Sequence, residues 1–81
     1  MAAVDALHLH AVIARALGVP ESQVSDELTY ASIPEWDSIG QMAIIAELEA
    51  TYGIELVPED ILAISSVADV RSVLVRSGVV A

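Results

Sequence analysis

Residues 35–53 read EWDSIGQMAIIAELEATYG, and they predict one long helix together with both of its ends. Asp37 and Ser38 are both favourable N-cap residues at its start, and Gly53 can adopt the left-handed conformation that ends a helix. Between them, apolar residues recur at spacings of three and four, as in a helix that packs on other helices. We therefore expect a helix from Ser38 to Tyr52.

The sequence on either side predicts three more helices. The first covers Val4–Leu17, where apolar residues keep a helical spacing until Gly18 ends it. A short third helix is expected at Pro58–Leu62, since proline and acidic residues suit a first helical turn. Ser66 and Asp69 fit a capping box that opens the last helix. No stretch alternates as a half-buried strand does, so we predict an all-α four-helix bundle with a long first loop and a short third helix.

The predicted loop at Pro20–Asp37 is unusually long for a compact domain. Loops of this length are often functional. We expect Val24, Leu28 and Tyr30 to anchor it to the hydrophobic core.

Composition restricts the class of protein. The chain has 81 residues, enough for one small domain, and we expect residues 1–81 to form a single domain. Twelve acidic residues stand against three arginines and no lysine, and the net charge is −9. Nucleic acids and anionic membrane surfaces are therefore poor partners, because phosphate binding requires Lys and Arg. The longest uncharged runs have nine residues, whereas a membrane-spanning helix needs about 20.

The start of the chain lacks the basic region of a secretory signal, so we expect a cytoplasmic protein, and a monomer. The absence of cysteine excludes disulfides and thiolate chemistry by the protein's own side chains. Residues 16–70 carry eleven acids and no base, so this region projects a negative field that favours basic partner surfaces. Alternatively, the acidic residues serve only to keep a small hydrophobic protein in solution.

The predicted helix at 38–52 has two apolar faces. One face is sufficient to bury it and comprises Ile44, Ile45, Leu48 and Tyr52. The other comprises Ile39, Met42, Ala43, Ala46 and Ala50. A helix that is apolar nearly all round is either fully buried or has a second face with a function. We expect an exposed ridge of Ile39, Met42 and Ala46, rimmed by Glu47 and Glu49, to dock partners; contact of this ridge with the long loop is the alternative.

Catalytic patterns are nearly absent from the sequence. His8 and His10 lie two residues apart on a helix, so their side chains diverge and cannot form a metal-binding pair. Neither a calcium loop nor a glycine-rich phosphate loop occurs, and Trp36 replaces the first glycine of a nucleophile elbow before Ser38. A hydrolase is therefore disfavoured, and we expect a protein without enzymatic activity or a metal site.

The junction of loop and helix leaves two interpretations open. Ser38 and Gln41 could form a capping box, which would make Ser38 a structural residue. Alternatively Asp37 caps the helix and leaves the Ser38 hydroxyl facing solvent. A phosphate ester on that hydroxyl would lie beside free N–H groups and the positive end of the helix dipole.

The sequence WDSIG at 36–40, the helix that follows it and YGIELVPEDI at 52–61 resemble the acyl carrier protein family. The resemblance runs essentially without gaps from Leu9 to Leu74. It includes LGV at 17–19 and SVADV at 66–70.

The resemblance implies that Ser38 carries 4′-phosphopantetheine, which a phosphopantetheinyl transferase attaches from coenzyme A with Mg²⁺. Asp37 is then the helix cap beside the attachment site. The arm's thiol would hold acyl or aminoacyl groups as thioesters and present them to acyl-loading, ketosynthase or tailoring enzymes with basic docking patches. Helices that part would enclose a short apolar chain, and the residues expected to line that space are Ile44, Ile45, Leu48, Ile61 and Leu62.

Departures from the family pattern bear on the pathway. Fatty-acid carriers usually have acids where this helix has Gly40, Ala43 and Ala50, and a partner pressing on the backbone would explain Gly40. We therefore expect a freestanding carrier of specialised polyketide or mixed polyketide–peptide biosynthesis. Peptidyl carriers usually have Gly-Gly where this chain has Glu35 and Trp36. An aminoacyl or peptidyl carrier, or an unmodified acidic helical adaptor, are the alternatives.

Overall fold

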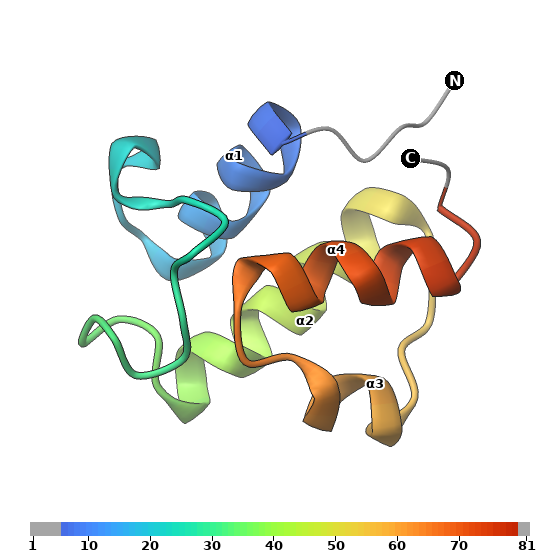
Figure 1. The fold of residues 1–81 in the computed structure, drawn as a ribbon. Helices are drawn as coiled ribbons and strands as arrows, with labels where there is room; N and C mark the ends of the chain where they lie inside the picture. Colours follow the sequence, from blue (N-terminus) through green and yellow to red (C-terminus); the bar gives the residue numbers. More distant parts are fainter. Residues whose placement is uncertain (1–5, 80–81) are drawn as a thin grey trace.

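The computed structural model describes residues 6–79, and this part of the chain is helical (Figure 1). The elements in chain order are α1 (Ala6–Leu17), a 3-10 turn η1 (Glu21–Gln23), α2 (Ser38–Tyr52), α3 (Pro58–Ala63) and α4 (Val67–Arg76). Over residues 6–79 there is no β-strand, only an isolated antiparallel bridge between Thr29 and Ser66. The prediction of a four-helix bundle with a long first loop and a short third helix is confirmed.

The helix ends follow the predicted chemistry closely. Gly53 ends α2 with a φ of 65°, and its N–H donates to the carbonyl of Glu49 at 3.0 Å. Pro58 begins α3, which extends one residue beyond the prediction to Ala63. The predicted start of the first helix at Val4 lies outside the described residues. None of the helices within residues 6–79 combines the length and apolarity needed to cross a bilayer.

The predicted capping box of α4 is half correct. The hydroxyl of Ser66 accepts from the backbone N–H of Asp69 at 3.1 Å, as an N-cap should. The Asp69 carboxylate, however, turns to Ser65, accepting from its N–H at 3.0 Å and from its hydroxyl at 2.8 Å. Two donors on one residue hold the carboxylate there, so Ser65 is fixed at the start of α4.

The core lies where α1, α2 and α4 meet. Its fully buried side chains are Leu9, Val12, Ile13, Trp36, Ile44, Leu48, Val67, Val70, Val73 and Leu74. Trp36 comes from the long loop rather than from a helix, and it is the largest of them. Truncating a buried Trp or Phe to Ala costs about 3–5 kcal/mol, so this side chain fastens the loop to the bundle.

Backbone hydrogen bonds tie the same loop to the segment between α3 and α4. The N–H of Tyr30 donates to the carbonyl of Ser65 at 2.9 Å, and the N–H of Val67 donates to Leu28 at 3.0 Å. As predicted, Val24 is buried and Leu28 packs against the core. The predicted role of Tyr30 as a core anchor is wrong: its side chain is 43% exposed and its hydroxyl lies at the start of α2. Trp36 fills the core under the loop instead, and a phenol hydroxyl favours a polar partner.

An ion cluster links the loop to two helices. The Asp26 carboxylate is 2.9 Å from Nε2 of His10 on α1. It also accepts two 3.0 Å hydrogen bonds from the guanidinium of Arg71 on α4. These hydrogen bonds, chiefly those from Arg71, lower the pKa of Asp26 to about 2.

Candidate functional site

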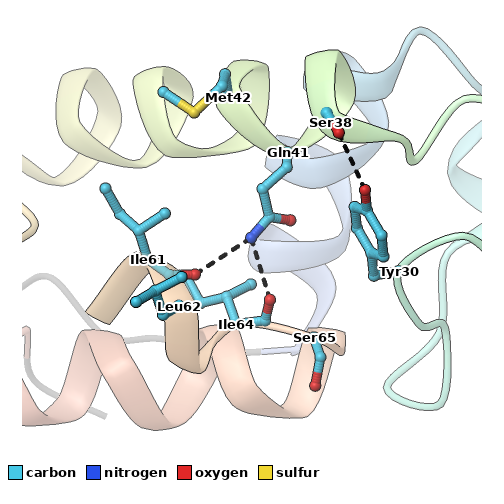
Figure 2. A pocket seen from close by; sticks show the side chains of 8 residues that line it. All are labelled: Tyr30, Ser38, Gln41, Met42, Ile61, Leu62, Ile64 and Ser65. Carbon is cyan, nitrogen blue, oxygen red and sulfur yellow. Dashed lines mark hydrogen bonds between the residues drawn. The ribbon is translucent and has the colours of Figure 1, made fainter. Parts of the chain in front are cut away.

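Ser38 is the first residue of α2, and its side chain is exposed at the junction with the long loop. Asp37 is the N-cap: its Oδ1 accepts from the N–H of Gly40 at 2.9 Å. Ser38 therefore does not cap the helix, and the capping-box interpretation is wrong. Its Oγ instead lies 3.2 Å from the hydroxyl oxygen of Tyr30, which reaches it across the junction (Figure 2).

Gln41, the other member of the rejected capping box, joins three parts of the chain. Its Oε1 accepts from the indole N–H of Trp36 at 2.7 Å. Its Nε2 donates to the carbonyls of Ile61 and Ile64, at 3.3 and 3.1 Å, as Figure 2 shows. The amide thus satisfies the buried indole and two carbonyls at the end of α3. This role was not predicted; the available signal was a glutamine in the apolar first half of the helix, five residues after a tryptophan.

A groove of about 420 Å³ opens beside Ser38, between α2 and α3. Its lining residues are Tyr30, Ser38, Gln41, Met42, Ile61, Leu62, Ile64 and Ser65. Figure 2 shows the hydroxyls of Tyr30 and Ser38 at one end, and Met42 and Ile61 at the other. The groove therefore combines a polar end at the serine with a mainly apolar remainder.

The residues expected to line a space between parted helices fall into two groups in this structure, and that space itself stays a prediction. Ile61 and Leu62 line the groove. Ile44, Ile45 and Leu48 do not, because they lie on the other face of α2 and are buried in the core with α1 and α4. The helical period separates the two faces: Met42 is on the groove side, and the buried stripe points into the bundle.

The second apolar face of α2 is exposed. The side chain of Ile39 is 80% exposed and that of Met42 is 57% exposed, and Ala46 continues this ridge. The long loop therefore does not cover Ile39 and Met42, which favours the docking interpretation of the ridge over the alternative. Leu62 on α3 is 86% exposed and adds to the apolar surface across the groove.

The two acids expected to rim the ridge both contact their own chain. Oε1 of Glu47 lies 3.5 Å from the guanidinium of Arg15 on α1. Oε2 of Glu49 accepts from the N–H of Leu56 at 2.9 Å and so fixes the connector between α2 and α3. Both contacts join segments that are separate in the sequence, and neither was predicted.

Gly40 is buried where the loop crosses α2. A Cβ at this position would overlap the backbone carbonyl oxygen of Glu35 and press on the side chain of Leu17. The close approach of the chain's own loop explains this glycine, so the expectation that a partner presses on the backbone here is not needed.

The Asp69 carboxylate fixes Ser65, which lines the groove near the start of α4. The hydroxyl and the backbone N–H of Ser65 hold the pKa of Asp69 below its usual range. The ionised carboxylate in turn holds the Ser65 hydroxyl. Over residues 6–79, no three His, Cys, Asp or Glu side chains cluster as metal ligands would.

Comparison with known families adds to this geometry. A family model described as "Phosphopantetheine attachment site" matches residues 8–74, most of the chain. The chain belongs to this family. The resemblance to acyl carrier proteins is confirmed at this level, and the chain is a phosphopantetheine-bearing carrier. Carrier domains of this kind are typically non-catalytic, and they interact with phosphopantetheinyl transferase and with partner enzymes. A search of curated proteins found no match to this carrier.

Proposed function

We propose that Ser38 is the attachment site and that the protein carries acyl groups as thioesters for specialised polyketide or mixed polyketide–peptide biosynthesis. The observation that carries this proposal is the exposed Ser38 hydroxyl, freed from capping by Asp37 and placed at the mouth of a groove. When bound, the 4′-phosphopantetheine group supplies a thiol that forms thioesters.

The residues around Ser38 fit such a group. Within the described residues, the N–H groups of Ser38 and Ile39 donate no hydrogen bond, so the first turn of α2 has donors left for a phosphate. The Asp37 carboxylate is occupied by the Gly40 N–H and stabilises the helix end that presents the serine. During transfer, the Ser38 oxygen bonds to phosphorus of coenzyme A as the bond to adenosine 3′,5′-bisphosphate breaks, and its proton passes to the transferase.

The exposed ridge of Ile39, Met42 and Ala46 supports docking by apolar contact. A carrier that visits several enzymes requires weak and transient binding to each, with the tethered cargo at high effective concentration within each complex. Two exposed positions of α2, Ala46 and Ala50, hold alanine and not an acidic residue. Such a surface favours partners that bind it through apolar contacts more than through ion pairs with carboxylates. This is the basis for preferring a specialised pathway over general fatty-acid synthesis.

Intact mass spectrometry tests the attachment site. The protein is incubated with coenzyme A, Mg²⁺ and a broad-specificity phosphopantetheinyl transferase. One added phosphopantetheine is expected, and Ser38→Ala should abolish it. Ser32→Ala, in the adjoining loop, is the matched control and should load fully. Loading that persists in the Ser38→Ala protein would place the attachment elsewhere, and no loading of the wild type would favour an unmodified adaptor.

The cargo is tested on protein isolated from its own host with the thioester intact. The pathway proposed here predicts an acyl or polyketide chain on the arm in the mass spectrum. An amino acid or peptide on the arm would instead identify an aminoacyl or peptidyl carrier.

A further inference from the structure

Tyr30 lies against the one oxygen atom that the proposed function requires. We propose that Tyr30 is a positioning residue of the modification site: its phenol orients the Ser38 hydroxyl before transfer and stays hydrogen-bonded to the Ser38 oxygen afterwards. This inference rests on the proposed attachment at Ser38. It adds a residue of the long loop to a site otherwise formed by α2 and the groove.

The backbone holds Tyr30 in place from both sides. Its own N–H donates to the carbonyl of Ser65 at 2.9 Å, within the bridge between Thr29 and Ser66. The next residue, Ala31, has a φ of 67° and donates its N–H to the carbonyl of Trp36 at 2.8 Å. A left-handed conformation is unfavourable for a residue other than glycine. The loop retains this strained residue directly beside Tyr30, so the backbone from which the phenol extends is held by the surrounding structure.

The tyrosine hydroxyl is not explained by packing. The Tyr30 side chain is 43% exposed, and Trp36 and Leu28 already fasten the loop to the core. A phenylalanine would cover the same apolar surface. The hydroxyl contributes one contact among the described residues, the 3.2 Å approach to Oγ of Ser38.

Either hydroxyl can donate in the unmodified protein, and the proposal assigns the donor to Tyr30. A hydroxyl has one donor and two acceptor lone pairs. When Tyr30 donates, the Ser38 oxygen keeps its own proton for removal and a second lone pair for attack on phosphorus. After esterification the Ser38 oxygen carries no proton, so Tyr30 is then the only possible donor of the pair. One orientation of the phenol therefore serves both states.

The hydrogen bond restricts rotation about the Cα–Cβ bond of Ser38. Before transfer this restriction preorganises the nucleophile, as a positioned reactant requires. After transfer it limits the directions in which a group attached to Ser38 can extend from the protein surface. Tyr30 and Ser38 both line the groove beside this point. Rotational restriction, unlike loading itself, is measurable with no partner enzyme present.

The test compares the wild type with Tyr30→Phe, which removes only the hydroxyl. In the unmodified protein, the Hα–Hβ three-bond couplings of Ser38 should match one staggered rotamer, and in the variant they should average over several. In the loaded protein, the ³¹P resonance of the phosphodiester should shift in the variant. The kcat/KM of transfer should fall by about three- to tenfold, through kcat, as expected from one lost hydrogen bond.

Ser72→Ala is the matched control, because the exposed Ser72 hydroxyl donates to the carbonyl of Ala68 within α4 and has no part in the turn that carries Tyr30. This variant should leave the Ser38 couplings and the ³¹P resonance as in the wild type. The inference is overturned if wild-type Ser38 already shows averaged couplings, a result that needs no variant. Equal couplings and equal ³¹P shifts in wild type and Tyr30→Phe overturn it as well, while leaving attachment at Ser38 intact. Failure of the wild type to load refutes the proposed function instead, and the couplings of the unmodified protein still test the contact with Tyr30.

Discussion

The side-chain oxygen of Gln41 accepts a 2.7 Å hydrogen bond from the indole N–H of Trp36, and this contact joins the long loop to α2. The same amide donates to the carbonyls of Ile61 and Ile64, which brings α3 into the connection. Three segments that border the groove are therefore held by one side chain. The indole of Trp36 is fully buried in the folded protein, so its N–H depends on Gln41 for a hydrogen-bond partner.

Gln41→Leu should lower the free energy of unfolding by about 2–3 kcal/mol, because a buried donor and helix-end carbonyls lose their partner. Chemical denaturation measures this change, and amide hydrogen exchange should show faster opening of α3. Gln41→Glu separates the two halves of the contact: it keeps an acceptor for Trp36 and loses the donor to α3. Gln23→Leu, at an exposed position of η1, is the control and should be nearly neutral. A Gln41→Leu protein as stable as this control contradicts the role assigned to the amide.

Gly40→Ala should destabilise the protein by about 1–3 kcal/mol, because the added Cβ overlaps the Glu35 carbonyl. Helix propensity alone predicts the opposite sign, since alanine is favoured over glycine inside a helix by about 1 kcal/mol. The sign of the change in thermal or denaturant unfolding therefore distinguishes loop contact from propensity. Ala46→Gly, on the exposed ridge of the same helix, is the matched control and should cost about 0.5–1 kcal/mol. A stabilised Gly40→Ala protein would show that the loop moves away without cost.

The elements predicted from the sequence are those whose signals are local. Ser38–Tyr52 is correct at both ends because Asp37 and Gly53 act through their nearest neighbours. The buried stripe and the exposed ridge of this helix follow from its period for the same reason. The capping of α4 by Ser66 is also local, and it was predicted.

Apart from the two capping boxes, the errors and omissions concern contacts that form only once separate segments have packed together. Nothing near Tyr30 indicates that its hydroxyl reaches Ser38, since the bridge to Ser65 that directs it forms only in the folded chain. The carboxylate of Glu49 similarly meets the N–H of Leu56 only once the connector has turned back. The candidate site could therefore be proposed from the sequence, whereas the side chains that fix its geometry could not.

Asp26→Asn should change the pH dependence of stability. The folded structure lowers the pKa of Asp26 from its ordinary value of 3.8 to about 2. The ionised carboxylate therefore stabilises the folded state fully above pH 3.8, and this contribution is lost as the pH falls through about 2. The wild type should therefore exceed the variant in stability near neutral pH, and the two should converge in acid. Thermal melts at a series of pH values measure the difference. Arg71→Gln should remove most of the same pH dependence, because the guanidinium is the largest cause of the lowered pKa; a persistent slope would contradict this assignment.

Asp37→Ala and Ser38→Ala should differ in stability although the two residues are adjacent. Asp37 accepts the Gly40 N–H, and loss of such a cap costs about 0.5–2 kcal/mol. The exposed Ser38 hydroxyl meets only that of Tyr30 among the described residues, so its removal should cost less than about 0.5 kcal/mol. Denaturant unfolding of the two variants measures both values. Equal losses would mean that Ser38 shares the cap in solution, and the hydroxyl proposed to receive the phosphopantetheine would then be partly withdrawn from the transferase. A stable Ser38→Ala protein that does not load shows the reverse: the chemistry, and not the fold, depends on this oxygen.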